Sequence, residues 1–349
     1  QRADKALVLG DDIDQAEDAE AMAEVWGHIA EVANGLNQEG VDARDIAAVI
    51  SRELCALTRQ ACKNAEADML AEGSGPPPCD YAMLVLGSGG RGESLLAMDQ
   101  DNAIVFAQGE PGGEQDRWFA ELGSRVATML DVAGVPYCKG NIMGSNADWR
   151  HSVAGWQATI ETWIKRQTPD DFLNCDIFFD AACVHGNYDL ANWVVDFAFE
   201  RGSKSASFIK VMSINACNDR SPIGMFGRFK LKDGRMDLKK GGIMLVFSTA
   251  RVLAIQHRVG KQSTPDRLHA VRDKYDNMLN TIDNLREAHR ILFNTILHQQ
   301  LLDLEAGIPP SNLIAPSALS ASGRKQLKWA LGQVPNVSNL LGDPLSPLA

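Results

Sequence analysis

The sequence lacks several patterns that would assign it to a familiar class of protein. Its seven cysteines include no C-x-x-C pair, and its seven histidines include no H-E-x-x-H spacing. These absences disfavour a disulfide framework and a zinc site, and they fit reduced thiols in the cytoplasm. No apolar stretch approaches the roughly 20 residues that a membrane span needs. We therefore expect a cytoplasmic protein without a membrane segment.

Acidic residues outnumber basic ones, 45 to 34. The formal net charge is -11, which disfavours broad binding to nucleic acid or to an anionic membrane. A local exception is residues 228–240, where six basic side chains accompany two acidic ones. The chain begins at Gln1 without an initiator methionine, so we expect it to be a segment of a longer polypeptide. Its 349 residues suffice for two or three domains.

What the sequence does contain is a glycine-rich turn followed closely by two acidic residues. An apolar run, residues 81–86, ends at Gly87-Ser88-Gly89-Gly90-Arg91-Gly92, and Asp99 and Asp101 precede a second apolar run, residues 103–107. Glycine lets backbone N–H groups approach phosphate oxygens without a Cβ in the way. The pattern predicts a strand, a phosphate-binding loop and a second strand that opens with the acidic pair.

The spacing of the acidic pair suggests a metal site. Side chains alternate faces along a strand, so Asp99 and Asp101 are expected to point the same way. Two carboxylates held together are unfavourable unless a cation neutralises them or one is protonated. Magnesium is a hard ion that is commonly bound by one or two carboxylates plus substrate phosphates.

Two other phosphate-binding motifs fit this stretch less well. Gly87, Gly89 and Gly92 satisfy G-x-G-x-x-G, but a dinucleotide-binding unit needs a helix after the last glycine and an acidic residue about 20 positions on. Here only six residues separate Gly92 from Asp99. No Gly-Lys-[Ser/Thr] follows, so a Walker-type loop is excluded. The remaining alternative for the acidic pair is a solvated turn before a strand.

The rest of the chain is predominantly helical in pattern. We expect two antiparallel helices within residues 14–72, joined near 35–41, and a linker over 73–80. Further helices are expected at 116–133 and 151–166, with a short extended piece at 135–138, a strand at 175–185, and a hairpin at 226–238 around Asp233-Gly234. Trp149, Trp156 and Trp163 are expected in the core. The prediction is an α+β protein with three parts: a helical segment (1–75), a small mixed-sheet domain (76–187) and an all-α domain (188–349).

Segments on both sides of the acidic pair resemble the nucleotidyltransferase superfamily, whose motif is a Gly-Ser or Gly-Gly turn followed by Asp-x-Asp. The closer resemblance is to bacterial nucleotidyltransferases of the DUF294 type, related to the catalytic domain of protein-PII uridylyltransferases. The segments that carry it span nearly the whole chain: residues 76–82, 87–93, 99–103, 136–140, 177–180, 236–243 and 264–268.

The resemblance implies transfer of a nucleoside monophosphate from ATP or UTP to a protein or small-molecule acceptor, in signalling or regulation. It implies Mg²⁺ as the cofactor, with Mn²⁺ as an alternative. Gly87, Ser88 and Gly89 would bind the triphosphate, and Asp99 and Asp101 would ligate the metal. The C-terminal helical domain would correspond to the family's substrate-binding domain. CBS or cyclic-nucleotide-binding domains upstream, and a homodimer, are further expectations.

The resemblance also suggests a third metal-binding and catalytic carboxylate at Asp180, with Asp176 as an alternative on the same face of a regular strand. Arg91 and Lys239 are candidates for phosphate contact. The competing interpretation of Arg91 is a local ion pair with Glu93, and that of Lys239 is a solvated basic surface.

One departure from the family pattern supports a rival function. Relatives tend to have an arginine two residues after the Asp180 position, where this chain has Ala182. If that arginine contacts phosphate, its loss favours a catalytically inactive module that senses a nucleotide. A third hypothesis is that the helical parts mainly bind partners.

Overall fold

The computed structural model describes residues 3–217, 223 and 228–342, which form two compact units. The first comprises Gln1–Val41 and Asp45–Ala198, and the second comprises Asp42–Arg44 and Phe199–Ala349. The fold is α+β, as predicted, with one small mixed sheet and helical segments before and after it. None of the described helices combines the length and apolar character that a membrane span requires.

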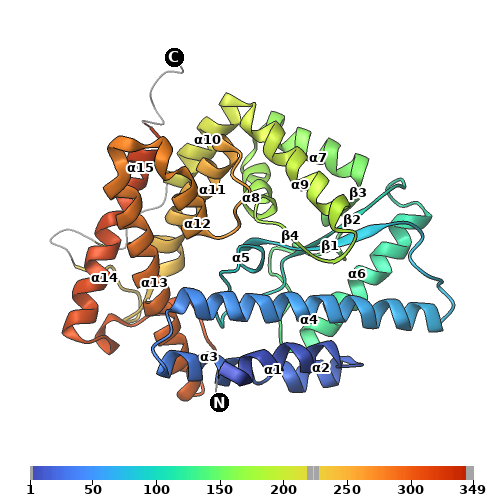
Figure 1. The fold of residues 1–349 in the computed structure, drawn as a ribbon, viewed down its shortest axis with the longest axis horizontal. Helices are drawn as coiled ribbons and strands as arrows, with labels where there is room; N and C mark the ends of the chain where they lie inside the picture. Colours follow the sequence, from blue (N-terminus) through green and yellow to red (C-terminus); the bar gives the residue numbers. More distant parts are fainter. Residues whose placement is uncertain (1–2, 218–222, 224–227, 343–349) are drawn as a thin grey trace. The chain divides into compact units, whose positions relative to one another are not determined.

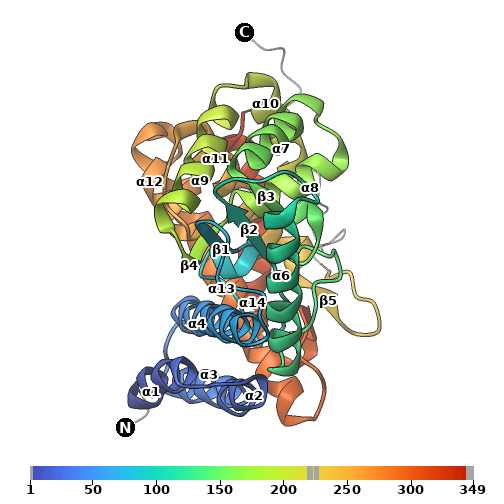
Figure 2. The same ribbon diagram turned by 90° about the vertical axis from the view of Figure 1, so that its right-hand side faces the viewer.

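The first unit begins with four helices: α1 (Ala3–Asp14), α2 (Ala19–Trp26), α3 (Ile29–Gln38) and α4 (Ala43–Ala71). Both views show α1 to α3 on the side of α4 that faces away from the sheet (Figures 1 and 2). The apolar stripe predicted for α4 is buried, with Ile46, Ile50 and Leu57 at most 1% exposed. The predicted helical pair is therefore present, but the first helix is broken after Trp26.

A four-stranded sheet lies at the centre of the first unit. Its strands are β1 (Tyr81–Val85), β2 (Asn102–Phe106), β3 (Arg150–Ser152) and β4 (Ala182–Gly186), in the order β3-β2-β1-β4. β1 pairs antiparallel with β2 and β4, whereas β2 and β3 are parallel, so the sheet is mixed. All residues of β1 and β2 are buried. Continuous apolar runs are typical of strands covered on both faces.

The other helices of this unit are α6 (Glu114–Val132), α7 (Val153–Arg166), α8 (Pro169–Phe178) and the part of α9 (Tyr188–Ser203) up to Ala198, where the unit ends. The three tryptophans predicted for the core are at most 5% exposed. Trp156 donates a hydrogen bond to the Ile104 carbonyl at 2.9 Å and packs on Phe178, with 4.7 Å between ring centroids. This cluster attaches α7 and α8 to the sheet.

The strand predicted at residues 175–185 is wrong over its first half. Cys175 to Phe178 belong to α8, and β4 begins only at Ala182. The helix starts at a capping box in which Thr168 and Asp171 satisfy each other's backbone N–H groups, with Pro169 in the first turn. These are strong helix-start signals. Because Asp176 is helical, the argument that placed it on one strand face with Asp180 also fails.

Two smaller predictions need correction. The loop predicted at the glycine turn contains a four-residue helix, α5 (Gly87–Gly90), and β2 begins at Asn102, after the acidic pair. Residues 135–138 form no strand, although the Pro136 carbonyl accepts a hydrogen bond from the Gln100 amide at 3.0 Å.

In its described residues, the second unit is helical apart from one pair of short strands and two isolated β-bridges. Its elements are α10 (Ala206–Cys217), β5 (Met236–Asp237), the π-helix η3 (Lys239–Ile243), α11 (Met244–His257), α12 (Thr264–Val271), η4 (Arg272–Lys274), η5 (Asp276–Met278), α13 (Leu279–Glu305), β6 (Leu313–Ile314), η6 (Pro316–Ala318), α14 (Ala321–Gln333), η7 (Val334–Asn336) and α15 (Val337–Leu340). The second unit also has its own core, in which α11 packs with α10 and α12, and α13 with α14.

The tight turn predicted at Asp233-Gly234 is confirmed. Both residues have positive φ, 52° and 78°, and Lys232 and Arg235 exchange backbone hydrogen bonds of 2.8 and 3.0 Å. The predicted hairpin is not regular, because β5 pairs with β6 instead of with the preceding arm. Residues 226 and 227 of that arm lie outside the described residues.

Candidate active site

Two glycines of the turn pack directly against acidic residues: Gly87 against Asp101 and Gly90 against Asp180. Gly87 has φ +53°, and a Cβ there would lie 2.9 Å from Oδ2 of Asp101. A Cβ on Gly90 would lie 1.9 Å from the backbone carbonyl oxygen of Asp180. Both contacts are shorter than real Cβ atoms make, so the glycines allow the turn to lie directly against the acidic segments.

The turn also packs against α4, through Gly89. A Cβ on Gly89 would meet side chains of Val85 and Leu54. The Ser88 hydroxyl lies 3.2 Å from that of Ser94. In a helix the first N–H groups have no intrahelical acceptor, and in α5 these belong to Gly87, Ser88 and Gly89. Such groups can donate to phosphate oxygens.

Asp99 and Asp101 lie on the same side of the chain, as the alternation argument predicted, although they precede the strand. Between them, Gln100 is buried and donates from Nε2 to the carbonyls of Ala127 and Val135, both at 2.9 Å. Both aspartates are half-buried. The backbone of Asp101 is also attached to the end of β1, because the Leu86 amide donates a hydrogen bond to the Asp101 carbonyl at 2.8 Å.

A third ligand-type side chain, Cys138, joins the acidic pair. One carboxylate oxygen from Asp99, one from Asp101 and the Cys138 sulfur all lie within 4.8 Å of one another. In the described part of the chain, these three residues form the group whose geometry suits a metal ion. Burial and the neighbouring Asp101 charge raise the pKa of the Cys138 thiol to about 12, against hydrogen bonds from the Ile142 and Gly140 backbone.

Sequence reasoning missed Cys138 because it treated the seven cysteines as scattered thiols. The residue belongs to a surface turn in which Asn141 has positive φ and its amide donates to the Cys138 carbonyl at 2.9 Å. A signal existed in the segment 136–140, which carries part of the family resemblance. Its contact with the acidic pair is tertiary, however, and local sequence does not reveal it.

Asp180 lies in a buried ion-pair network behind the turn and is not a member of the metal-suited group. Its Oδ2 is 2.5 Å from Nη1 of Arg91, whose Nε is 2.8 Å from Oε2 of Glu93. All three side chains are at most 6% exposed. The local Arg91–Glu93 ion pair considered from the sequence is thus present, and Arg91 also reaches Asp180.

Lys239 lies in the second unit, exposed at the start of η3. Most of the basic side chains around it are exposed too, at positions 228, 230, 232 and 240. Arg235 differs, since it forms a bidentate pair with Asp303 at 2.7 Å through each nitrogen.

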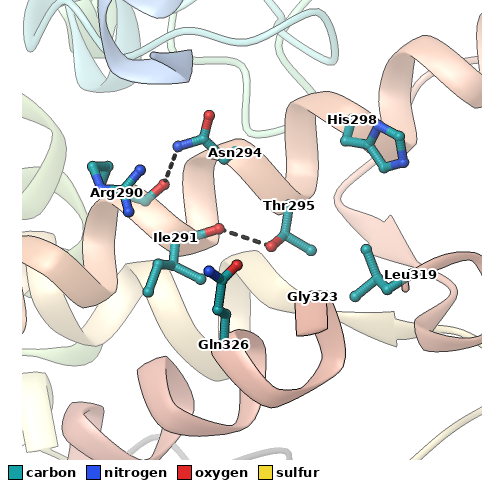
Figure 3. Close-up of a pocket in the computed structure, with 8 residues that line it drawn as sticks. All are labelled: Arg290, Ile291, Asn294, Thr295, His298, Leu319, Gly323 and Gln326. Atoms are coloured by element: carbon teal, nitrogen blue, oxygen red, sulfur yellow. Dashed lines mark hydrogen bonds between the residues drawn. The ribbon is translucent and has the colours of Figure 1, made fainter. Parts of the chain in front are cut away.

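The second unit contains a cavity of about 290 Å³ between α13 and α14. Figure 3 shows polar side chains along one face of α13 and Gln326 opposite them on α14. The lining residues are Arg290, Ile291, Asn294, Thr295, His298, Leu319, Gly323 and Gln326. The Arg290 guanidinium is paired with Glu287, and the Asn294 amide contacts Asp42 and the Arg290 carbonyl. A mixture of polar and apolar groups at one opening is typical of a site for a small molecule. The sequence signal was the polar residues at four-residue spacing on a helix with apolar faces.

Comparison with known families gives matches over most of the chain. The model described as "Putative nucleotidyltransferase DUF294" matches residues 27–170. The model described as "Putative nucleotidyltransferase substrate binding domain" matches residues 206–343. The glycine turn, the acidic pair and Cys138 lie in the first range, the cavity lies in the second, and Asp180 lies in neither. No curated protein matches the chain.

Proposed function

We propose that this chain, which belongs to the DUF294 family of nucleotidyltransferases, moves a nucleoside monophosphate from a nucleoside triphosphate to a protein or small-molecule acceptor in signalling or regulation. The observation that carries the proposal is the contact between the glycine turn and the acidic pair, in which Gly87 leaves room only for the Asp101 carboxylate. The proposed phosphate-binding amides and metal-binding oxygens therefore adjoin each other. This arrangement suits attack of an acceptor hydroxyl on the α-phosphorus, which forms the new oxygen–phosphorus bond, breaks the bond to the β-phosphate and releases pyrophosphate.

The donor set fits a divalent cation. Asp99 and Asp101 offer hard oxygen ligands that are half-buried and so remain accessible from solvent, which suits Mg²⁺ or Mn²⁺. When bound, such an ion neutralises charge on the transferred group and lowers the pKa of an attacking hydroxyl.

The chain's own residues position the nucleotide. We assign the triphosphate to the amides of Gly87, Ser88 and Gly89, with the Ser88 hydroxyl as a further donor. Arg91 and Asp180 hold the back of the turn through their buried ion pair, so we assign Asp180 a positioning role in place of direct metal ligation. Lys239, exposed in the second unit, is retained as a proposed contact to phosphate.

Acceptor recognition is assigned to the second unit. Two observations support this: the matching family model describes a substrate-binding domain, and the cavity between α13 and α14 lies within the matched residues. Polar groups from Arg290, His298 and Gln326 line it, which favours a polar portion of the acceptor.

Incubation with nucleoside triphosphates labelled at the α-phosphate, Mg²⁺ or Mn²⁺, and a cell lysate tests the proposal. We expect label on a lysate component with the wild-type chain and none with Asp99→Asn plus Asp101→Asn. Asp131→Asn, an exposed carboxylate on α6, is the matched control and should retain labelling. Label that persists in the double variant would refute the assignment of the acidic pair.

The rival function, a nucleotide sensor without activity, is favoured by Ala182 in place of the family's arginine and by the engagement of Asp180 with Arg91. The same protein and labelled nucleotides distinguish the sensor from the transferase. Saturable binding of a nucleoside triphosphate by calorimetry, without label transfer under any condition, would support the sensor.

A further inference from the structure

We propose that Cys138 is a third protein ligand of the metal held by Asp99 and Asp101, and that its sulfur raises the affinity of the site for thiophilic ions such as Co²⁺ and Zn²⁺ above that of the two carboxylates alone. This inference rests on the proposed function for the existence of the metal site. It adds a ligand, and with it a choice of metal, that the two carboxylates alone do not imply.

The three candidate ligand atoms lie close enough together to share one ion. The Cys138 sulfur and one oxygen from each aspartate lie within 4.8 Å of one another. Zn–S and Zn–O bonds are about 2.3 and 2.0–2.2 Å long, so a single ion between the three atoms requires only small side-chain adjustments. Asp99 and Asp101 are half-buried, so an ion can reach the group from the side of the carboxylates.

The turn that carries Cys138 is fixed relative to the acidic pair by backbone contacts. The Asn102 amide donates to the Ile142 carbonyl at 3.0 Å, and the Gln100 amide to the Pro136 carbonyl at 3.0 Å. The Asn102 side chain also accepts from the Gly144 amide at 2.8 Å. Residues 136–144 and 99–102 are therefore tied together on both sides of the thiol, which keeps the three ligand atoms in one place.

Without an ion the Cys138 sulfur keeps its proton, because burial, the Asp101 charge and a hydrogen bond with Asp101 raise the pKa of the thiol. The backbone N–H groups of Ile142 and Gly140 act in the opposite direction. A cation between the three ligand atoms would take the place of that proton and neutralise the charges gathered there. On metal binding the thiol releases its proton to solvent while the sulfur forms a bond to the ion. No oxidation is involved.

Ligand chemistry then decides the preference. Thiolates bind Zn²⁺ and other soft or borderline ions well, whereas Mg²⁺ prefers oxygen ligands and water. A site with two carboxylates and one thiolate is therefore expected to bind Co²⁺ and Zn²⁺ more tightly than an all-oxygen site does. The same thiolate offers little to Mg²⁺.

Cobalt binding to the purified chain tests the inference without measuring catalysis. We expect Co²⁺ to produce a sulfur-to-metal charge-transfer band in the near ultraviolet, and Cys138→Ser to abolish the band and weaken Co²⁺ binding by about tenfold or more. Cys79→Ser, at another partly exposed cysteine, is the control and should keep both. Cys138→Asp should lose the band and raise Mg²⁺ affinity. Circular dichroism checks that each variant folds.

The outcomes separate this inference from the proposed function. A charge-transfer band that needs Cys138, Asp99 and Asp101 supports the inference even if no nucleotide is transferred. Absence of the band in wild type, with equal Co²⁺ affinity in Cys138→Ser, overturns it even if transfer with Mg²⁺ is observed. Co²⁺ binding that survives Asp99→Asn plus Asp101→Asn also overturns it, because the site would then lie elsewhere.

Discussion

The Asp180 carboxylate receives a hydrogen bond from Arg91 at 2.5 Å, although 89 positions separate the two residues in the chain. Asp180 is fully buried and Arg91 is nearly so. The pair links the segment before β4 to the end of the glycine turn. A carboxylate predicted as a metal ligand is therefore engaged with the last residues of the glycine turn.

Breaking this pair should destabilise the protein. Arg91→Gln leaves the buried carboxylates of Asp180 and Glu93 without this cation, and an uncompensated buried charge costs about 3–5 kcal/mol. Asp180→Asn costs less, because Arg91 keeps its ion pair with Glu93. We expect a lower urea midpoint for Asp180→Asn and a larger decrease for Arg91→Gln. Glu72→Gln, which removes the exposed partner of Arg125, should have a much smaller effect. If Asp180→Asn had wild-type stability but weakened metal binding, the result would support direct ligation of the metal by Asp180.

A methyl group at Gly90 should disturb the turn. The added Cβ would meet backbone oxygens of Asp180 and Val85 at 1.9 and 2.7 Å, and neither can move without shifting a strand or the segment before one. We expect Gly90→Ala to lose at least about 2 kcal/mol of unfolding free energy and to bind nucleotide weakly. Gly332→Ala in α14, where the added carbon meets nothing, should be neutral or gain up to about 1 kcal/mol. Equal free energies of unfolding for Gly90→Ala and Gly332→Ala would contradict the close contacts at Gly90.

Acid should unfold the first unit partly through Asp171. Hydrogen bonds from Arg166, and then from Thr168, lower the pKa of this carboxyl from 3.8 to about 2, against the effect of burial. Because the folded pKa lies below the unfolded one, the stabilisation is complete above about pH 4 and is lost as the pH falls towards 2. Asp171→Asn should flatten the pH dependence of stability in this window, measured by urea unfolding. Asp170→Asn, at the exposed neighbour, should retain the wild-type slope.

Filling the cavity in the second unit should reduce labelling of the acceptor without changing the affinity for the nucleotide. Gln326→Trp places a large ring at the cavity lined by α13 and α14, whereas Lys325→Trp places the same ring on an exposed neighbouring position of α14. We expect labelling of the lysate acceptor to fall at least about tenfold in the first variant only, a loss of about 1.4 kcal/mol of binding free energy. Calorimetric nucleotide binding should be equal in both. Unchanged labelling with Gln326→Trp would exclude the cavity as an acceptor site.

The parts of the site that the sequence predicted are those defined by short-range spacing. The glycine turn and the i, i+2 aspartates follow from local pattern, and the buried Gln100 between them explains why the alternation held without a strand. Cys138 and the Arg91–Asp180 pair were missed because they depend on contacts between distant segments.

The misassigned strand has a different cause. The aromatic and β-branched residues around Ile177 favoured a strand, while the Thr168–Asp171 capping box upstream was overlooked. Local helix-start chemistry fixed the first turn of α8, and packing of Phe178 on Trp156 stabilised its last.

The contact between Gly87 and Asp101 also predicts what a substitution at position 87 would change first. A Cβ there would lie 2.9 Å from Oδ2 of Asp101, the end of a flexible side chain, and the φ of +53° favours glycine. An added methyl group would therefore turn the Asp101 carboxylate aside, so Gly87→Ala should alter the direction of that carboxylate more than the packing of the sheet.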